Sequence, residues 1–102
     1  MDEKEKFLLF LEDYPDYYTI LQSKLFVSLI EFITDAPKSI TEIYGKYAKI
    51  NRGDLDEMLK TLEDLKLIVR VRSTENLLWK ITDKGHELME QFHAFKEYID
   101  VI

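Results

Sequence analysis

The apolar positions in the middle of the chain follow the spacing of two successive helices. In residues 39–47, the positions that would share one helical face are Ile40, Ile43, Tyr44 and Tyr47. From residue 51 onward, a second and longer stripe is formed by Leu55, Met58, Leu59, Leu62 and Leu65. Residues 48–50 leave room for a short turn between them. The pattern therefore predicts two helices joined by a tight turn.

Polar residues at the predicted helix starts support these boundaries. Ser39 precedes the first helix and Glu42 follows three residues later, which is the spacing of a capping box. Asn51 precedes the second helix, where its side chain can accept an amide hydrogen from the first turn. Thr82 and Asp83 would cap and charge the start of a third helix.

Between the second and third helices, the pattern changes to alternation with a period of two. Residues 67–72 alternate, residues 73–76 are polar, and residues 77–81 return as an apolar segment, which together predict two strands joined by a turn. The order is helix, tight turn, helix, hairpin and helix. This is the order of a winged helix-turn-helix, a nucleic-acid-binding scaffold, with residues 51–65 as the candidate recognition helix.

The same stretch resembles the winged-helix transcription regulators of the MarR and PadR type, in their short archaeal forms. The most specific segments are Leu59–Ile68, which spans the end of the recognition helix, and Trp79–Gly85, which is similar to the "LTxKG" that follows the wing. Tyr44 and Lys66 stand where such proteins usually have a small residue and Gly. The resemblance implies a mainly α fold with a small antiparallel β-wing (α+β class) and a DNA-binding regulator.

A chain of 102 residues is long enough for one domain. We expect a single winged helix-turn-helix domain over residues 1–102, with extended helices at both ends. The predicted parts are N-terminal helices in residues 1–36, the helix-turn-helix and first wing strand in residues 39–72, the wing in residues 73–81, and a C-terminal dimerisation helix in residues 82–102.

Net charge is an objection to a DNA partner, because the chain carries -6 and has a pI near 4.9, whereas DNA-binding domains are typically basic. The distribution of charge reduces this objection. Residues 1–36 carry -5 and residues 73–102 carry -3, whereas residues 37–72 carry +2. The positive part is therefore the predicted helix-turn-helix and first wing strand.

The candidate DNA-contacting residues follow from this distribution. On the first helix, the turn, the recognition helix and the wing strand, they are Lys38, Lys46, Lys49, Asn51, Arg52, Lys60, Thr61, Arg70 and Arg72. Base contacts would come from Arg52, Lys60 and Thr61. A solvated face of mixed charge is the alternative interpretation of scattered lysines.

The recognition helix also exposes acidic residues, which repel phosphates. These residues are Asp54, Asp56, Glu57 and Asp64. Two interpretations remain open. One is a DNA-binding transcriptional regulator that anchors on double-stranded DNA through phosphates; the other is an acidic winged-helix module that binds a protein of the transcription or replication machinery and does not touch DNA.

Apolar residues also recur near both ends of the chain. Towards the C-terminus a heptad seam is formed by Leu88, Phe92, Phe95, Ile99 and Ile102. Before Pro15, a similar stripe is formed by Phe7, Phe10, Leu11 and Tyr14. The next predicted helix continues with Tyr18, Leu21, Leu25, Leu29 and Phe32.

Because one chain of this size has little surface with which to cover both terminal stripes, they predict a homodimer. Its two recognition helices would lie roughly 34 Å apart, one turn of DNA. The alternative is that the end helices pack on each other and on the core within one chain.

Other chemistry finds little support in the sequence. There is no Cys, and His86, Glu90 and His93 could share a helical face but are more typical of a solvated surface, so we expect no metal, no cofactor and no enzymatic activity. No apolar run reaches the roughly 18 residues of a membrane span, and we expect a cytoplasmic protein. Tyr14, Tyr17 and Tyr18 leave open a small-molecule effector pocket, although aromatic residues at helical spacing are also ordinary core or interface.

Overall fold

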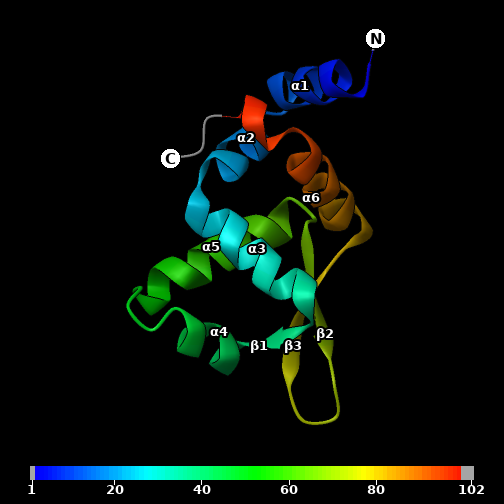
Figure 1. Ribbon diagram of the computed structural model, residues 1–102. Helices are drawn as coiled ribbons and strands as arrows, with labels where there is room; N and C mark the ends of the chain where they lie inside the picture. Colours follow the sequence, from blue (N-terminus) through cyan, green and yellow to red (C-terminus); the bar gives the residue numbers. More distant parts are fainter. Residues whose placement is uncertain (1, 100–102) are drawn as a thin grey trace.

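The computed structural model describes residues 2–99. In chain order its elements are α1 (Glu3–Asp13), α2 (Pro15–Gln22), α3 (Lys24–Asp35), β1 (Lys38–Ser39), α4 (Ile40–Lys46), α5 (Arg52–Asp64), β2 (Ile68–Arg72), β3 (Leu77–Ile81), α6 (Asp83–Phe95) and a 3-10 helix (Lys96–Tyr98). The α+β winged helix predicted from the sequence is confirmed (Figure 1).

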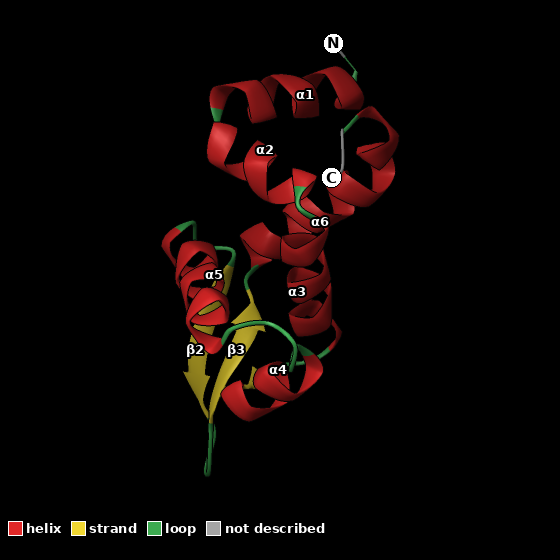
Figure 2. Cartoon of the chain, turned by 90° about the vertical axis from the view of Figure 1, so that its left-hand side faces the viewer, coloured by secondary structure: helices red, strands yellow, loops and turns green. Residues whose placement is uncertain are grey.

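The molecule is elongated, with principal extents of 47 × 27 × 20 Å. One end holds α1, α2 and the 3-10 helix, and the other end holds α4, the turn before α5, and the hairpin of β2 and β3 (Figures 1 and 2). The helix α3 lies between these two ends and packs against β3. This arrangement separates the helix-turn-helix and wing from the terminal helices.

The N-terminal region forms three helices. The break at Pro15 is confirmed, since Pro15 begins α2. A second break, which apolar spacing did not reveal, falls at Ser23. Its hydroxyl accepts a hydrogen bond from the Phe26 amide at 3.3 Å and caps α3. The continuous helix expected through residues 18–32 is therefore wrong, because Ser23 favours a cap over a helix interior.

The helix-turn-helix begins as its capping residues indicate. Ser39 and Glu42 form the predicted capping box at the start of α4. Asn51 caps α5, since its side-chain oxygen accepts from the amides of Gly53 at 2.7 Å and Asp54 at 3.3 Å. The stripe of α5 is buried except for the half-buried Leu65, whereas in α4 only Ile43 is fully buried. The opposite face of α5 lies in solvent.

The sheet has three antiparallel strands in the order β1-β3-β2. The hairpin pairs Arg70 with Trp79 and Arg72 with Leu77. The short strand β1 was not predicted, because the capping box of Ser39 and Glu42 indicated only a helix start. It pairs Lys38 with Trp79, so that the residues just before α4 attach this helix to the wing.

One hydrophobic core runs through the chain and includes the terminal helices. Phe7 and Leu11 of α1 are buried together with Leu88 and Phe92 of α6. The aromatic rings of Phe7 and Phe95 lie 5.9 Å apart. For the described residues, the alternative in which the end helices pack within one chain is therefore the observed one.

Candidate nucleic-acid interface

The exposed face of α5 carries the residues expected to approach bases. Arg52, Lys60 and Thr61 are all exposed. The Thr61 hydroxyl donates to the backbone oxygen of Glu57 at 2.9 Å, which turns it back onto the helix. Asn51 was predicted as a DNA contact. Its side-chain oxygen accepts the two capping hydrogen bonds, so that only its side-chain NH2 group is left to bind a ligand.

An aromatic residue of α4 organises the first turns of α5. The Tyr44 hydroxyl donates to Asp56 Oδ1 at 2.6 Å, and the Arg52 guanidinium lies 4.7 Å from the centre of the Tyr44 ring. The hydrogen bond to Asp56 is the main reason that the pKa of Tyr44 is raised above its ordinary value. Tyr44 therefore holds both an acid and a base of the recognition helix.

The predicted basic contacts on the turn and the wing differ in how far they are free to bind a ligand. Lys49 in the turn and Arg72 on the wing are exposed, and neither forms an ion pair with another residue in the described part of the chain. Lys46 is also exposed, with its ammonium 5.2 Å from the centre of the Phe32 ring.

Lys38 is placed differently from the other basic residues. It is 7% exposed, its ammonium lies 4.7 Å from the centre of the Phe32 ring, and it faces Asp35 at 3.9 Å. A cation shared between an aromatic face and a carboxylate has little left to offer a phosphate. Lys38 thus anchors β1 to α3 instead of pointing to a ligand.

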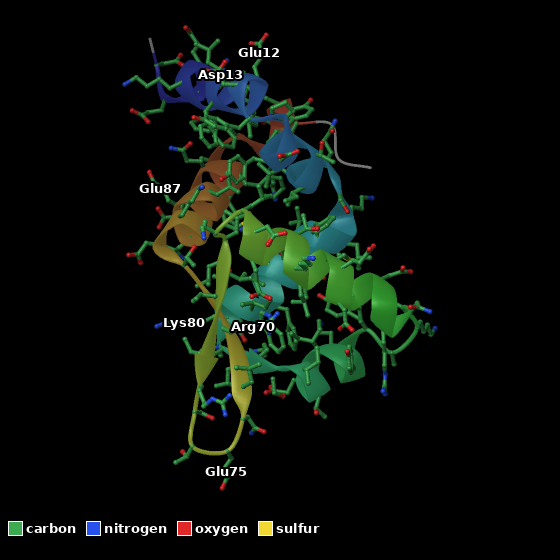
Figure 3. All side chains as sticks on the ribbon, turned by 180° about the vertical axis from the view of Figure 1, so that it is seen from behind. Glu12, Asp13, Arg70, Glu75, Lys80 and Glu87 are labelled. Atoms are coloured by element: carbon green, nitrogen blue, oxygen red, sulfur yellow. The ribbon has the colours of Figure 1, made fainter. Side chains whose placement is uncertain are left out.

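Arg70 is also engaged within the protein. Its Nε donates to both carboxylate oxygens of Glu63, at 3.0 and 2.9 Å. Figure 3 shows Arg70 and Lys80 on opposite sides of the wing, as the alternation along paired strands requires. The wing residue with an unengaged guanidinium is therefore Arg72, at the end of β2.

The excess of acidic over basic residues lies away from this interface. In Figure 3, Glu12 and Asp13 lie on α1, at the end of the molecule opposite the wing tip, and Glu87 lies on α6. Acidic residues also occur at the interface itself: Glu75 stands at the wing tip, and α5 exposes Asp54, Asp56, Glu57 and Asp64. The sequence shows the same separation, with a charge of -5 in residues 1–36 and +2 in residues 37–72.

Comparison with known sequences identifies the family. The profile of the family described as winged helix-turn-helix matches residues 22–100, most of the chain. The chain belongs to the winged helix-turn-helix family. A search of curated proteins finds no significant match.

Solved structures show the same fold. The chain is similar to a MarR-family transcriptional regulator from Enterococcus faecalis V583, with a TM-score of 0.71 and 18% identity over 96% of this chain and 86% of that one. It is also similar to the transcriptional regulator BldR from Sulfolobus solfataricus, with a TM-score of 0.59 and 19% identity over 72% of this chain and 55% of that one. A third similar structure is an ArsR-like transcriptional regulator from Rhodococcus sp. RHA1, with a TM-score of 0.59 and 13% identity over 85% of this chain and 82% of that one. The chain thus spans about half of BldR.

In this winged helix-turn-helix protein, the terminal residues predicted for a dimer interface lie mostly in the core. Those buried are Phe7, Leu11, Leu88, Phe92 and Ile99. Phe10 and Phe95 are half-buried, Tyr14 is exposed, and Ile102 lies outside the described residues. The heptad seam is also interrupted, because α6 ends at Phe95 and a 3-10 helix follows. The argument that one chain could not cover both stripes is therefore wrong for the described residues.

A hollow of about 340 Å³ lies between α1, α2 and α6 of the winged helix-turn-helix protein. Its lining is mixed: apolar and aromatic side chains such as Phe10, Tyr17 and Leu67 alternate with charged and polar ones, among them Lys84, whose ammonium lies 4.9 Å from the centre of the Tyr17 ring. Of the three tyrosines considered for an effector pocket, Tyr17 lines this hollow, whereas Tyr14 is 54% exposed.

The two histidines of the winged helix-turn-helix protein face different carboxylates. His86 Nε2 lies 3.2 Å from Glu90 Oε1, and His93 Nε2 lies 3.5 Å from Glu31 Oε1. Within residues 2–99, no three His, Cys, Asp or Glu side chains are grouped so that they could hold a metal ion. Over the same residues, every helix is too short or too polar to cross a membrane.

Proposed function

We propose that this winged helix-turn-helix protein is a DNA-binding transcriptional regulator. The observation that carries the proposal is the position of its unengaged basic side chains. Lys49 lies in the turn before α5 and Arg72 at the end of β2, and Figure 1 shows this turn and the wing in the same half of the molecule as the start of α5. These are the places where a winged helix meets the phosphates that flank a groove.

The proposed phosphate contacts are Lys46, Lys49, Arg52 and Arg72. Arg52 has a second role open to it, since a guanidinium at the start of a recognition helix reaches guanine edges well. Lys60 and Thr61 lie further along the exposed face of α5. We expect phosphate contacts to dominate, which gives modest sequence discrimination from one protomer.

We also propose that the protein acts as a homodimer. The buried terminal residues cannot form its interface unless the chain unfolds. The interface would therefore be formed by apolar side chains that remain exposed at the end of the molecule that holds α1 and α2. Leu9 is 44% exposed, Tyr14 is 54% exposed and Tyr98 is 49% exposed. Two copies joined there would leave both wings and both recognition helices free, and binding to two half-sites one DNA turn apart requires the copies to meet at an angle that turns both wings to the same duplex.

Binding of a labelled duplex of random sequence, followed by fluorescence anisotropy at two salt concentrations, tests DNA binding. Four to eight phosphate contacts per dimer predict that log affinity falls with log salt at a slope of roughly -4 to -7. Reversing two charges in Lys49→Glu/Arg72→Glu should weaken binding to every duplex and flatten that slope, because both residues contact phosphates.

The matched control reverses two exposed lysines away from the interface, as Lys6→Glu/Lys24→Glu. It should bind DNA nearly as well as the parent after allowance for its net charge. Equal loss in both double variants would show that only total charge matters. A parent protein without salt-sensitive binding would contradict the proposal and favour the acidic protein-docking module.

A further inference from the structure

One carboxylate joins the recognition helix to both strands of the wing. Glu63 lies in the last turn of α5, and its oxygens accept Arg70 Nε at 3.0 and 2.9 Å and Trp79 Nε1 at 3.2 Å. Its side chain is 22% exposed, and Trp79 is 7% exposed. A charge-assisted contact of this kind, partly shielded from water, is stronger than an ordinary surface ion pair.

The register of the hairpin explains why a single side chain can hold both strands. Arg70 of β2 and Trp79 of β3 are direct cross-strand partners, so they project from the same face of the sheet. The Arg70 guanidinium also lies 5.6 Å from the centre of the Trp79 ring. We call Glu63, Arg70 and Trp79 the wing clamp.

The backbone route from α5 to the wing is short and fixed at its start. The Leu67 amide donates to the Leu62 oxygen and the Lys66 amide to the Glu63 oxygen, both at 2.9 Å. This closes α5 with a Schellman motif. The wing therefore leaves α5 from a defined point, and the clamp ties both of its strands back to α5, in addition to the pairing of β3 with β1 and its packing on α3.

We propose that Glu63 is a positioning residue for DNA binding, acting through the wing clamp to hold Arg72 and α5 in the geometry that lets both reach one duplex. This inference rests on the proposed function. Arg70 then serves in the clamp and is not a phosphate contact, although it lies only two residues from Arg72. The two arginines of the wing strand have different roles.

The substitution Glu63→Gln gives opposite predictions for a clamp and for a bare charge. If Glu63 were only a negative charge near DNA, neutralising it would tighten binding, because carboxylates repel phosphates. If it positions the wing, the loss of the charged hydrogen bonds should weaken binding by about three- to tenfold. The sign of the change decides between them.

Asp64→Asn is the matched control, because Asp64 is the exposed neighbour of Glu63 on the same helical turn. Removing this charge should leave DNA binding unchanged or tighten it. Arg70→Gln should weaken binding about as much as Glu63→Gln and leave the salt slope near that of the parent, whereas Arg72→Gln should reduce the slope by about one per protomer.

Trp79 gives an independent readout, because it is the single tryptophan of the chain. Its fluorescence emission and its quenching by acrylamide should change in Glu63→Gln and Arg70→Gln, and should stay as in the parent in Asp64→Asn and Arg72→Gln. Circular dichroism shows whether each variant is folded, and Glu63→Asp provides a second variant if Glu63→Gln unfolds.

Weaker binding and altered fluorescence in both clamp variants, with an unchanged salt slope, would support the inference. Tighter binding by Glu63→Gln, or a reduced slope in Arg70→Gln, would overturn it while leaving DNA binding intact. A parent that binds no duplex would instead overturn the proposed function, a result distinct from either of these.

Discussion

At the scale of single residues, the recognition helix ends with a lysine in a backbone conformation that usually requires glycine. Lys66 has a φ of 65°, the left-handed region that favours Gly, and it is the non-Gly residue with positive φ among residues 2–99. It occupies the C′ position of the Schellman motif, where Gly is usual. The resemblance to MarR- and PadR-type regulators led us to expect Gly at position 66, but the left-handed backbone of Lys66 could not be predicted from the sequence.

Lys66→Gly should therefore stabilise the protein. A side chain in the left-handed region crowds its own backbone, and Gly removes that cost but gains freedom in the unfolded chain. We expect a net gain of about 0.5–1 kcal/mol in the free energy of unfolding, measured by urea denaturation. Lys60→Gly, the same change inside α5, should lower the free energy of unfolding by about 1 kcal/mol. If Lys66→Gly also lowered it, the backbone at Lys66 would not be strained.

Tyr44 offers a way for the acidic recognition helix to meet DNA as proposed. Its hydroxyl binds the Asp56 carboxylate, and its ring supports Arg52. An acid held by a hydroxyl has a fixed position and a more dispersed charge than a free one. This contact could not be predicted from the residue pattern, because hydrogen bonds between residues on different helices depend on how the helices pack.

Tyr44→Phe should weaken DNA binding by roughly two- to fivefold, because it releases the Asp56 carboxylate next to the phosphates and keeps the ring under Arg52. Asp56→Asn should restore the affinity in the Tyr44→Phe background. Anisotropy titrations of the parent, both single variants and the double variant measure this coupling. Additive effects would mean that the two side chains act independently.

At the scale of elements, Thr82 and Gly85 in the segment Trp79–Gly85 are explained by the close approach of this segment to the backbone of Lys66 and Leu67. The Thr82 hydroxyl donates to the Lys66 and Leu67 oxygens at 2.6 and 3.0 Å and accepts the Gly85 amide at 3.0 Å. A Cβ on Gly85 would lie 2.2 Å from the Leu67 oxygen. Thr82 and Gly85 are thus needed where α6 begins against Lys66 and Leu67, the two residues just before β2.

Gly85→Ala should destabilise the fold by about 1–3 kcal/mol, because the added methyl meets a backbone oxygen that cannot move aside freely. Gly45→Ala is the matched control, since nothing lies within 4 Å of a Cβ there and the residue sits inside α4. It should stabilise by about 0.5–1 kcal/mol. Thermal unfolding measures the stability of both variants. An equal change in stability in the two variants would contradict the close contact at Gly85.

The elements that the sequence predicted well are those with local signals. Capping residues such as Ser39 and Asn51 act within their own first turn, and the alternation in residues 67–72 needs no partner to be recognised. The strand β1 and the break at Ser23 were missed, since a two-residue strand exists only through its pairing with β3. The terminal stripes were correctly seen as apolar, but their partner was the same chain.

The candidate site was predictable in its location and less so in its members. Residue type and position indicated a basic turn and wing, and Lys49 and Arg72 are indeed exposed there. Lys38 and Arg70 have the same residue types but contact Phe32 and Glu63. Whether a cation faces solvent or a partner from another element is decided by packing, which spacing along the chain does not reveal.

At the scale of the whole molecule, charge and shape separate two ends. The acidic end carries α1 and α2 together with the exposed apolar side chains Leu9, Tyr14 and Tyr98. The opposite end carries the turn and the wing. A dimer joined at the acidic ends would keep both wings free, and it would leave the negative residues far from the phosphates.

Leu9→Asp should convert a dimer to a monomer at micromolar concentration without unfolding, because Leu9 is largely exposed in the single chain and a charge placed in an apolar interface is costly. Light scattering measures the mass. Phe92→Asp should instead unfold the protein, since Phe92 is buried. A parent that is already monomeric would contradict the dimer.

The central claim, that duplex DNA binds across α5, the preceding turn and the wing, is tested most directly by NMR. A ¹⁵N-labelled sample would be titrated with a duplex of roughly 20 base pairs, long enough for two half-sites one turn apart. The account predicts amide shifts at Lys49, Arg52 and Arg72 and in their neighbours, with α1 unchanged apart from line broadening. Shifts confined to α1, α2 and α6, or none at all, would contradict it.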